Sequence, residues 1–146
     1  MPKKLVSAKA TIGSSYEIDL TTRQFSFKVD QPKPSGNDIA PTPLEYFFAA
    51  LGACACTIGK IVSDQKKIDL NSINVDVEGD VETDFLLGKT KEGRAGFTSI
   101  RVNIEIDANA SDQEKRELVD EIKRRCPVSD NIENISNVEW IYTARK

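Results

Sequence analysis

The chain of 146 residues, 39% of them hydrophobic, is long enough to build one core, and we predict a single domain over residues 1–146. Its formal net charge of −3 argues against a nucleic-acid-binding surface. The sequence has no histidine, which excludes an imidazole base, and its 3 cysteines are too few for a secreted disulfide scaffold. Thiol chemistry is therefore the first chemistry to consider.

The N-terminal segment predicts a three-stranded meander. Apolar and polar residues alternate in three short runs, which is typical of half-buried strands. A turn at residues 13–15 separates the first two runs, and the proline-containing residues 31–40 form a loop. The opening segment MPKKLVSAKA has no apolar stretch long enough for a signal peptide, so we expect a cytoplasmic protein with reduced thiols. The alternating apolar residues are Val6, Ala8, Ala10 and Ile12, then Tyr16, Ile18 and Leu20, then Phe25, Phe27 and Val29.

A long helix follows, with a clear start. Thr42 is suited to the N-cap, Pro43 to the first helical position and Glu45 to the N3 position of a capping box. We predict a helix from Pro43 to about Lys66. Residues 44–62 are mostly apolar but include two charges and two glycines, which favours a buried central helix over a membrane-spanning one.

Two further strands are predicted around a glycine-containing connection. Alternation marks a fourth strand around residues 73–77 and a fifth around residues 100–106. The connection, residues 83–96, carries the apolar residues 85–87. These residues either cover a pocket from a mobile loop or extend the fourth strand, and we favour the extension.

The last third predicts a helix and a strand. Ser111 and Glu114 form a second capping box, and the helix runs to about Cys126, where Pro127 ends it. Residues 129–137 are polar and contain a helical turn, and alternation at residues 138–142 predicts a final strand. The predicted order βββ-α-ββ-α-β indicates an α+β fold with antiparallel pairing.

The three cysteines are not equivalent. Cys54 and Cys56 lie two positions apart on the predicted helix, where side chains point about 200° away from each other, so they cannot share a metal site. Free cysteine is often a buried small hydrophobe, and this interpretation is favoured for Cys56. From the residues alone it would also hold for Cys54.

Cys126 stands at a helix end, before a proline and after the basic residues 123–125. Cationic neighbours favour a thiolate, whereas the negative end of the helix dipole opposes it, and the sequence leaves the balance open. The basic residues can equally well serve only to complement the helix dipole.

Other charged residues can support a thiol site. Capping fully accounts for Glu45, although a carboxylate there can also act at a site. An arginine can hold a thiolate or a peroxide oxygen by charge-assisted hydrogen bonds, and the candidates are Arg23, Arg94 and Arg101.

Two motifs resemble the OsmC/Ohr family, which comprises osmotically inducible protein C and the organic hydroperoxide resistance proteins. Residues 42–54, TPLEYFFAALGAC, resemble its first-cysteine helix, and residues 126–129, CPVS, resemble its second-cysteine motif. Residues 29–32 also fit, and the element order matches across nearly the whole chain.

The resemblance implies an OsmC-like fold: antiparallel sheets packed on a long central helix in an intertwined homodimer, with active sites at the subunit interface. Cys54 would be the peroxidatic thiol and Cys126 the resolving one, with Glu45 and Arg23 as supporting residues. The implied activity is reduction of organic hydroperoxides or hydrogen peroxide in oxidative-stress defence. An external dithiol, which is a lipoylated protein in some relatives, would regenerate the thiols, and no cofactor, metal, nucleic acid or membrane is expected.

The chain departs from the hydroperoxide-resistance branch in three respects. Leu44 stands where that branch has glutamate, no Gly-Gly-Arg segment supplies an arginine, and Cys56 is additional. The pattern is closer to the OsmC-like branch. Two other hypotheses stay open: a dimeric module that binds a small apolar ligand near residues 46–48, and a redox sensor without turnover.

Overall fold

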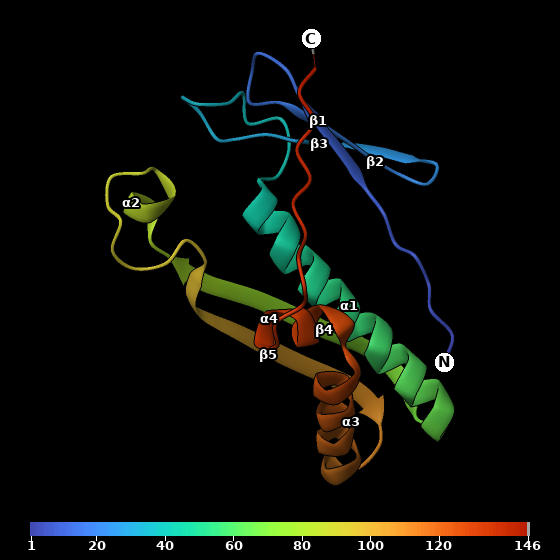
Figure 1. Cartoon of the computed structure of the whole chain (residues 1–146). Helices are drawn as coiled ribbons and strands as arrows, with labels where there is room; N and C mark the ends of the chain where they lie inside the picture. The colour runs from blue at the N-terminus through green and yellow to red at the C-terminus, as the bar shows by residue number, and fades with distance from the viewer. Residues whose placement is uncertain (146) are drawn as a thin grey trace. The chain divides into compact units, whose positions relative to one another are not determined.

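The computed structural model describes residues 1–145 and has an α+β architecture with antiparallel sheets and a long helix, as predicted (Figure 1). The chain forms two compact units, Met1–Ala49 and a second that begins at Ala50. The prediction of a single domain remains a prediction.

The N-terminal unit contains the expected meander. β1 (Lys9–Ile12), β2 (Ile18–Thr22) and β3 (Phe25–Val29) pair antiparallel in the order β1-β2-β3. β1 is shorter than the predicted run, which began at Val6, because pairing with β2 starts only at Lys9. The aromatic residues of β3 are followed by Val29 and Asp30, which are buried.

The loop after β3 is built on the carboxylate of Asp30. This side chain is fully buried and accepts hydrogen bonds from the backbone N–H groups of Gln31 (2.8 Å), Asn37 (3.1 Å) and Ile39 (3.3 Å). Gly36 is required here because a Cβ at that position would collide with the Gln31 carbonyl oxygen and the Asp30 carboxylate. The loop therefore folds around one buried anion before the long helix begins.

α1 (Pro43–Lys66) has the predicted bounds. Thr42 Oγ1 accepts a hydrogen bond from the Glu45 N–H at 3.3 Å and donates one to the Glu45 carboxylate at 3.1 Å, which confirms the cap. The Tyr46 hydroxyl donates to the Lys28 carbonyl at 2.7 Å, and its ring packs on Phe27. These contacts attach the start of α1 to β3.

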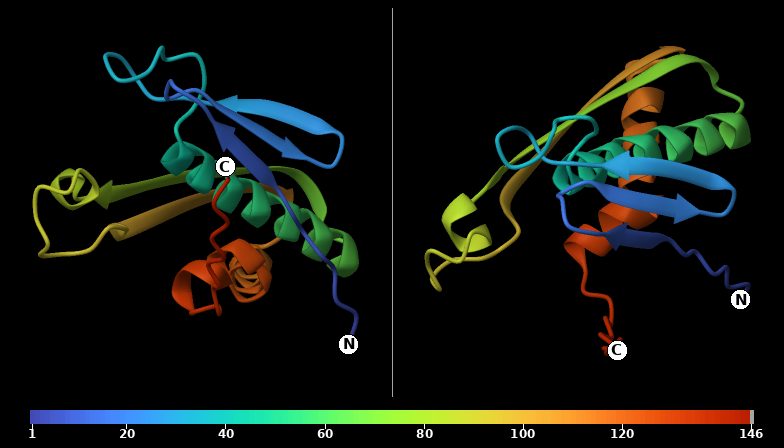
Figure 2. Two further views of the ribbon diagram at one scale, coloured as in Figure 1. Left: turned by 45° about the horizontal axis from the view of Figure 1, so that its top comes forward. Right: turned by 90° about the horizontal axis from the view of Figure 1, so that it is seen from above.

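The second unit is built on a long two-stranded ribbon. β4 (Asp69–Val81) and β5 (Phe97–Asn109) pair antiparallel over nearly their full length, and one face is apolar. That face packs on α1 and on α3 (Asp112–Arg125), as Figure 2 allows the reader to follow. The core consists of Ala55, Val62, Leu118 and Ile122, flanked by Ile58, Val75, Ile104 and Ile106.

By length and composition alone, α1 is a helix that could cross a membrane. Among its buried residues are Leu51, Ala55 and Val62, and the latter two belong to the core of the second unit. This packing agrees with the favoured prediction of a central helix.

The connection between β4 and β5 differs from the prediction. Residues 83–86 form a short helix, α2 (Thr83–Leu86), and do not extend the fourth strand. The β4–β5 ladder ends at Val81 paired with Phe97, so the following N–H groups have no partner strand and bond locally, as from Leu87 to Thr83 at 2.9 Å. Leu86 and Leu87 remain exposed.

α3 begins as predicted, with Ser111 Oγ accepting a hydrogen bond from the Glu114 N–H at 3.2 Å. Leu118 and Ile122 share its buried face. α4 (Pro127–Glu133) follows directly and contains the helical turn expected after Cys126.

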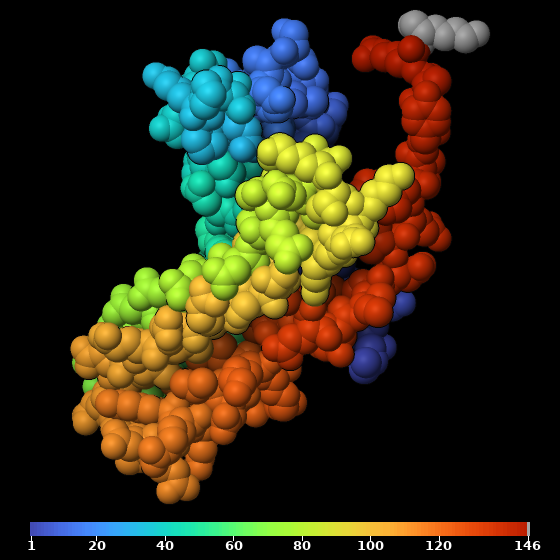
Figure 3. Space-filling view, turned by 90° about the vertical axis from the view of Figure 1, so that its left-hand side faces the viewer, coloured from blue at the N-terminus to red at the C-terminus, as the bar shows by residue number. Residues whose placement is uncertain are grey.

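The predicted final strand is wrong for this structure. Residues 135–145 form no helix or strand, and the described tail is exposed along its length (Figure 3). Val138, Trp140 and Tyr142 are 66%, 93% and 88% exposed. An alternating segment becomes a strand only when a neighbouring strand edge accepts its hydrogen bonds, and no described strand pairs with it.

Candidate functional site

Two thiols from distant segments meet in the second unit. Cys54 is presented by α1, and Cys126 by the junction between α3 and α4. The two thiols lie close enough for Cys126 to raise the pKa of Cys54, and both are free in this structure. Cys54 is half-buried and Cys126 is 1% exposed, so the contact is largely shielded from water.

The local sequence fixes the position of Cys126. Its N–H donates to the Ile122 carbonyl and closes α3, while its own carbonyl accepts from the Asp130 N–H and opens α4, both at 3.0 Å. Pro127 imposes an extended backbone on the residue before it, and Cys126 has φ −73° and ψ 111°. Cys126 is therefore the C-cap of α3 and the N-cap of α4.

The proline has a second consequence. Pro127 has no N–H, so Val128 supplies the first free donor at the start of α4, and this N–H lies near enough to the Cys54 sulfur to act on its pKa. Burial raises the pKa of the Cys54 thiol, and the neighbouring Cys126 raises it further, whereas the Val128 N–H lowers it. The net pKa is raised, so the described residues around Cys54 favour the protonated thiol.

The basic residues before Cys126 are mostly engaged elsewhere. Arg124 pairs with Glu121 at 2.9 Å, and Arg125 contacts Glu121 at 3.7 Å and donates to Gln65 at 2.9 Å. Only Lys123 of the three lines the cavity beside Cys126. From the sequence alone, the negative dipole end of the helix before Cys126 opposes a thiolate. In the structure, the negative end of α3 and the positive end of α4 meet at Cys126, so the two dipoles act on the thiol in opposite directions.

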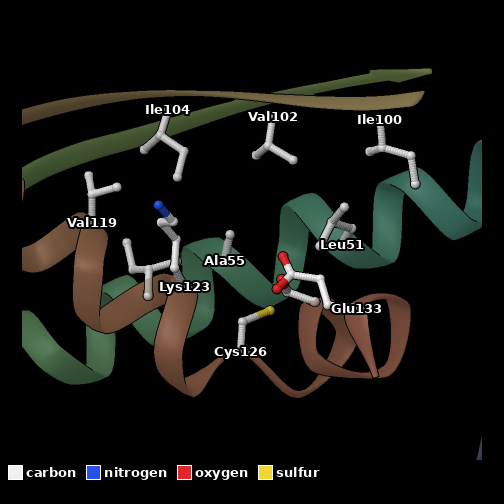
Figure 4. Close-up of a pocket in the computed structure, with 11 residues that line it drawn as sticks. Leu51, Ala55, Ile100, Val102, Ile104, Val119, Lys123, Cys126 and Glu133 are labelled. Carbon is white, nitrogen blue, oxygen red and sulfur yellow. The ribbon is translucent and has the colours of Figure 1, made fainter. Parts of the chain in front are cut away.

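A cavity of about 450 Å³ opens beside the Cys126 thiol (Figure 4). Its walls are mostly apolar and come from α1, β5 and α3, while α4 contributes polar groups. This size and character suit a small organic molecule. The principal lining residues are Leu51, Ala55, Ile100, Val102, Ile104 and Val119, with Lys123, Ser129 and Glu133 as polar groups.

The three candidate arginines lie in different surroundings. Arg101 belongs to the polar face of the ribbon, where it bonds Glu78 and Asp80, both at 2.8 Å, while its neighbours Ile100 and Val102 face the cavity. Arg94 folds over Gly96 in the β4–β5 connection.

Arg23 and Glu45 both belong to the N-terminal unit. Arg23 occupies the β2–β3 turn with φ 50° and lies over the Phe25 ring at 4.9 Å. Glu45 takes part in the capping box of α1. Within the described chain, no arginine is among the groups that shift the Cys54 pKa.

Cys56 points to the ribbon, where its thiol donates to the Ile73 carbonyl at 3.7 Å. This contact separates it from the pair formed by Cys54 and Cys126. Among residues 1–145, no group of three or more histidine, cysteine or carboxylate side chains is placed to hold a metal ion.

Sequence reasoning missed the Val128 N–H and the polar groups of the cavity, Lys123, Ser129 and Glu133. A proline directly after Cys126 is a signal for the first, since proline at the first helical position exposes the next N–H. The cavity groups carried no comparable signal, because the packing of α3 and α4 against β5 decides which of them face inward.

Comparisons with known proteins bear on the family and the fold of the chain. Residues 35–141 match the OsmC-like protein family. The chain is 25% identical over 129 residues to a hydroperoxide reductase of Mycoplasma genitalium, a match that covers 88% of this chain and 86% of the relative.

Among solved structures, an OsmC-like protein from Mycoplasma pneumoniae superposes with a TM-score of 0.80 at 22% identity, covering 92% of this chain and 91% of the other. An organic hydroperoxide resistance protein OsmC from Legionella pneumophila gives a TM-score of 0.63 at 23% identity, with coverages of 90% and 91%.

Proposed function

Because this chain belongs to the OsmC-like protein family, we propose that it is a thiol-dependent peroxidase acting on organic hydroperoxides or hydrogen peroxide. The observation that carries the proposal is the contact between the Cys54 and Cys126 thiols beside a mostly apolar cavity. Relatives named hydroperoxide reductase support the same class of reaction.

In the first step, the Cys54 thiolate attacks the terminal oxygen of the hydroperoxide. A sulfur–oxygen bond forms, the oxygen–oxygen bond breaks, and the alkoxide leaves as an alcohol after taking a proton. Cys54 is oxidised to a sulfenic acid and the peroxide is reduced.

In the second step, Cys126 attacks the Cys54 sulfur, a disulfide forms and water leaves. The contact of the two thiols means that only a small movement is needed for this bond. An external dithiol, such as a lipoylated protein in the cytoplasm, then reduces the disulfide by exchange.

A second copy of the chain is part of the proposal. Burial and Cys126 raise the Cys54 pKa, so a cation that is not among the groups acting on Cys54 in the single chain is needed to favour the thiolate, and Arg23 is our first candidate. Exposed apolar side chains support pairing of two chains in solution, among them Ile61 (40%), Trp140 (93%) and Tyr142 (88%). Light scattering on the purified protein should give twice the monomer mass.

The decisive experiment exposes the reduced protein to cumene hydroperoxide. We expect the intact mass to fall by two hydrogen atoms, a Cys54–Cys126 link in the peptide map, and continued peroxide consumption when a dithiol is present. Cys54→Ser should abolish consumption, Cys126→Ser should stop at a sulfenic acid that dimedone traps, and Cys56→Ser is the matched control.

Full activity in Cys54→Ser would refute the proposal. A disulfide that forms once without turnover would instead favour a redox sensor of the same fold. No reaction of either thiol with peroxide would favour a module that only binds an apolar ligand.

A further inference from the structure

The buried thiol of Cys126 must lose its proton when it attacks Cys54, and the chain has no histidine to accept it. Cys126 is 1% exposed, so bulk water does not reach it directly. Its sulfur opens into the cavity, where the other titratable side chains are Lys123 and Glu133. A proton acceptor for Cys126 is therefore to be sought in this cavity.

From this shared cavity we infer that Glu133 is the proton acceptor of Cys126 in the step that forms the disulfide. This inference rests on the proposed function. It adds a role for a residue that neither of the two cysteine motifs contains.

Helix geometry brings the two groups to one face. Cys126 is the N-cap of α4 and Glu133 is its last residue, about two turns further on and on the same side. Side chains on a helix lean toward its N-terminus, so the Glu133 carboxylate leans toward Cys126. In Figure 4 the Glu133 carboxylate and the Cys126 sulfur point toward each other from the α4 side of the cavity.

Glu133 is also available for this role. Its carboxylate has no ion pair or hydrogen bond within the described chain, unlike Asp130, which accepts a hydrogen bond from Asn134 at 3.0 Å. Glu133 is exposed, so it can exchange protons with water while its carboxylate faces the cavity. Lys123, from α3, faces the same cavity as an ammonium group and cannot accept a proton.

The proton balance closes within the step. The Glu133 carboxylate takes the Cys126 proton, directly or through one water, as the sulfur–sulfur bond forms and the sulfur–oxygen bond of the sulfenic acid breaks. The departing hydroxide takes that proton back from Glu133 and leaves as water. Glu133 ends the step as the carboxylate, and no further reactant is required.

The test follows the lifetime of the sulfenic acid. After a pulse of cumene hydroperoxide, samples are quenched with dimedone, and the adduct and the disulfide are measured by mass spectrometry. In Glu133→Gln we expect the sulfenic acid to persist on the order of 10- to 100-fold longer, the range for loss of general base catalysis. Millimolar acetate should restore part of the rate, which a purely structural defect would not permit.

A second measurement does not depend on peroxide. In a Cys56→Ser background, dithiobis(nitrobenzoate) forms a mixed disulfide with Cys54, and attack by Cys126 then releases a second nitrothiobenzoate. Glu133→Gln and Glu133→Ala should both slow that second release, while Asp130→Asn, a carboxylate on the same helix outside the cavity, should not.

Wild-type rates of second release in either Glu133 variant would overturn the inference, and so would equal slowing in Asp130→Asn. Failure of the proposed peroxidase function would give a different result in these two measurements. In that case the wild-type protein gives no dimedone adduct with peroxide, while the release from the mixed disulfide still reports on Glu133.

Discussion

Asp30 in the N-terminal unit and Cys54 in the second unit are both acidic groups that the fold withdraws from water, yet their pKa values move in opposite directions. Hydrogen bonds from backbone N–H groups, the Gln31 bond first, lower the pKa of Asp30 against the effect of burial. Burial raises the pKa of Cys54, and the single Val128 N–H does not offset it.

The difference shows what decides the charge of a buried acid here. Three N–H groups within hydrogen-bond distance replace the water that Asp30 loses, whereas Cys54 receives one N–H and faces a second thiol. The loop around Asp30 is complete as it stands. Within the described chain, no cationic side chain is among the groups that shift the Cys54 pKa, so we expect the largest effects from changing a residue proposed to supply that charge.

The first prediction concerns that partner. If Arg23 supplies the proposed charge-assisted contact to the thiolate, Arg23→Gln should slow the reaction of Cys54 with hydroperoxide on the order of 10- to 100-fold. Arg101→Gln should leave the rate within about twofold, since Arg101 is held by Glu78 and Asp80 on the polar face of the ribbon. Stopped-flow kinetics of both variants measures the difference, and equal rates for Arg23→Gln and wild type would exclude Arg23.

The second prediction concerns the loop that is built on the Asp30 carboxylate. Asp30→Asn removes the negative charge that three backbone N–H groups bind, so the Tm should fall by about 5 °C or more. Asp38→Asn, an exposed acid in the same loop, is the control and should change the Tm little. Differential scanning calorimetry at neutral pH distinguishes them.

The same carboxylate predicts a pH dependence with a definite sign. A pKa lowered by folding contributes stability above the unfolded value of about 4, and this contribution is lost as the pH falls through the folded value. Wild-type stability should therefore decline on acidification below about pH 4, and Asp30→Asn should decline less steeply. Parallel slopes for the two proteins in urea titrations would contradict this assignment.

A fourth prediction tests the single donor at Cys54. Val128→Pro removes the N–H but fits the first turn of α4, so the pKa of Cys54 should rise further and its alkylation by iodoacetamide at pH 8 should slow about two- to fivefold. Val128→Ala keeps the N–H and should react at nearly the wild-type rate. Equal alkylation rates for the proline and alanine variants would show that the Val128 N–H does not affect the reactivity of Cys54.

The smallest effect is expected at Cys56. Its thiol donates only a weak hydrogen bond to the Ile73 carbonyl, so Cys56→Ser should change peroxide turnover by less than about twofold. A larger loss of peroxide turnover in a steady-state assay would indicate that Cys56 takes part in the reaction together with Cys54.

Features that depend on neighbours along the chain could be predicted before the structure was known. Thr42, Pro43 and Glu45 set the start of α1, and Ser111 set that of α3, because capping hydrogen bonds join residues three positions apart. The alternating runs predicted β2 to β5, because alternation of apolar residues is also a local pattern. The two cysteine motifs indicated the family before any contact was known.

The remaining features depend on contacts between distant segments. A strand needs a neighbouring strand to bond, and no described strand pairs with residues 138–142, so their alternation did not make a strand. The Val128 N–H reaches Cys54 only because the start of α4 packs beside α1, and Glu133 enters the cavity only because α4 follows α3 without a loop. Such contacts join segments far apart in sequence, and their distances are set by the packing of whole elements and not by local residue patterns.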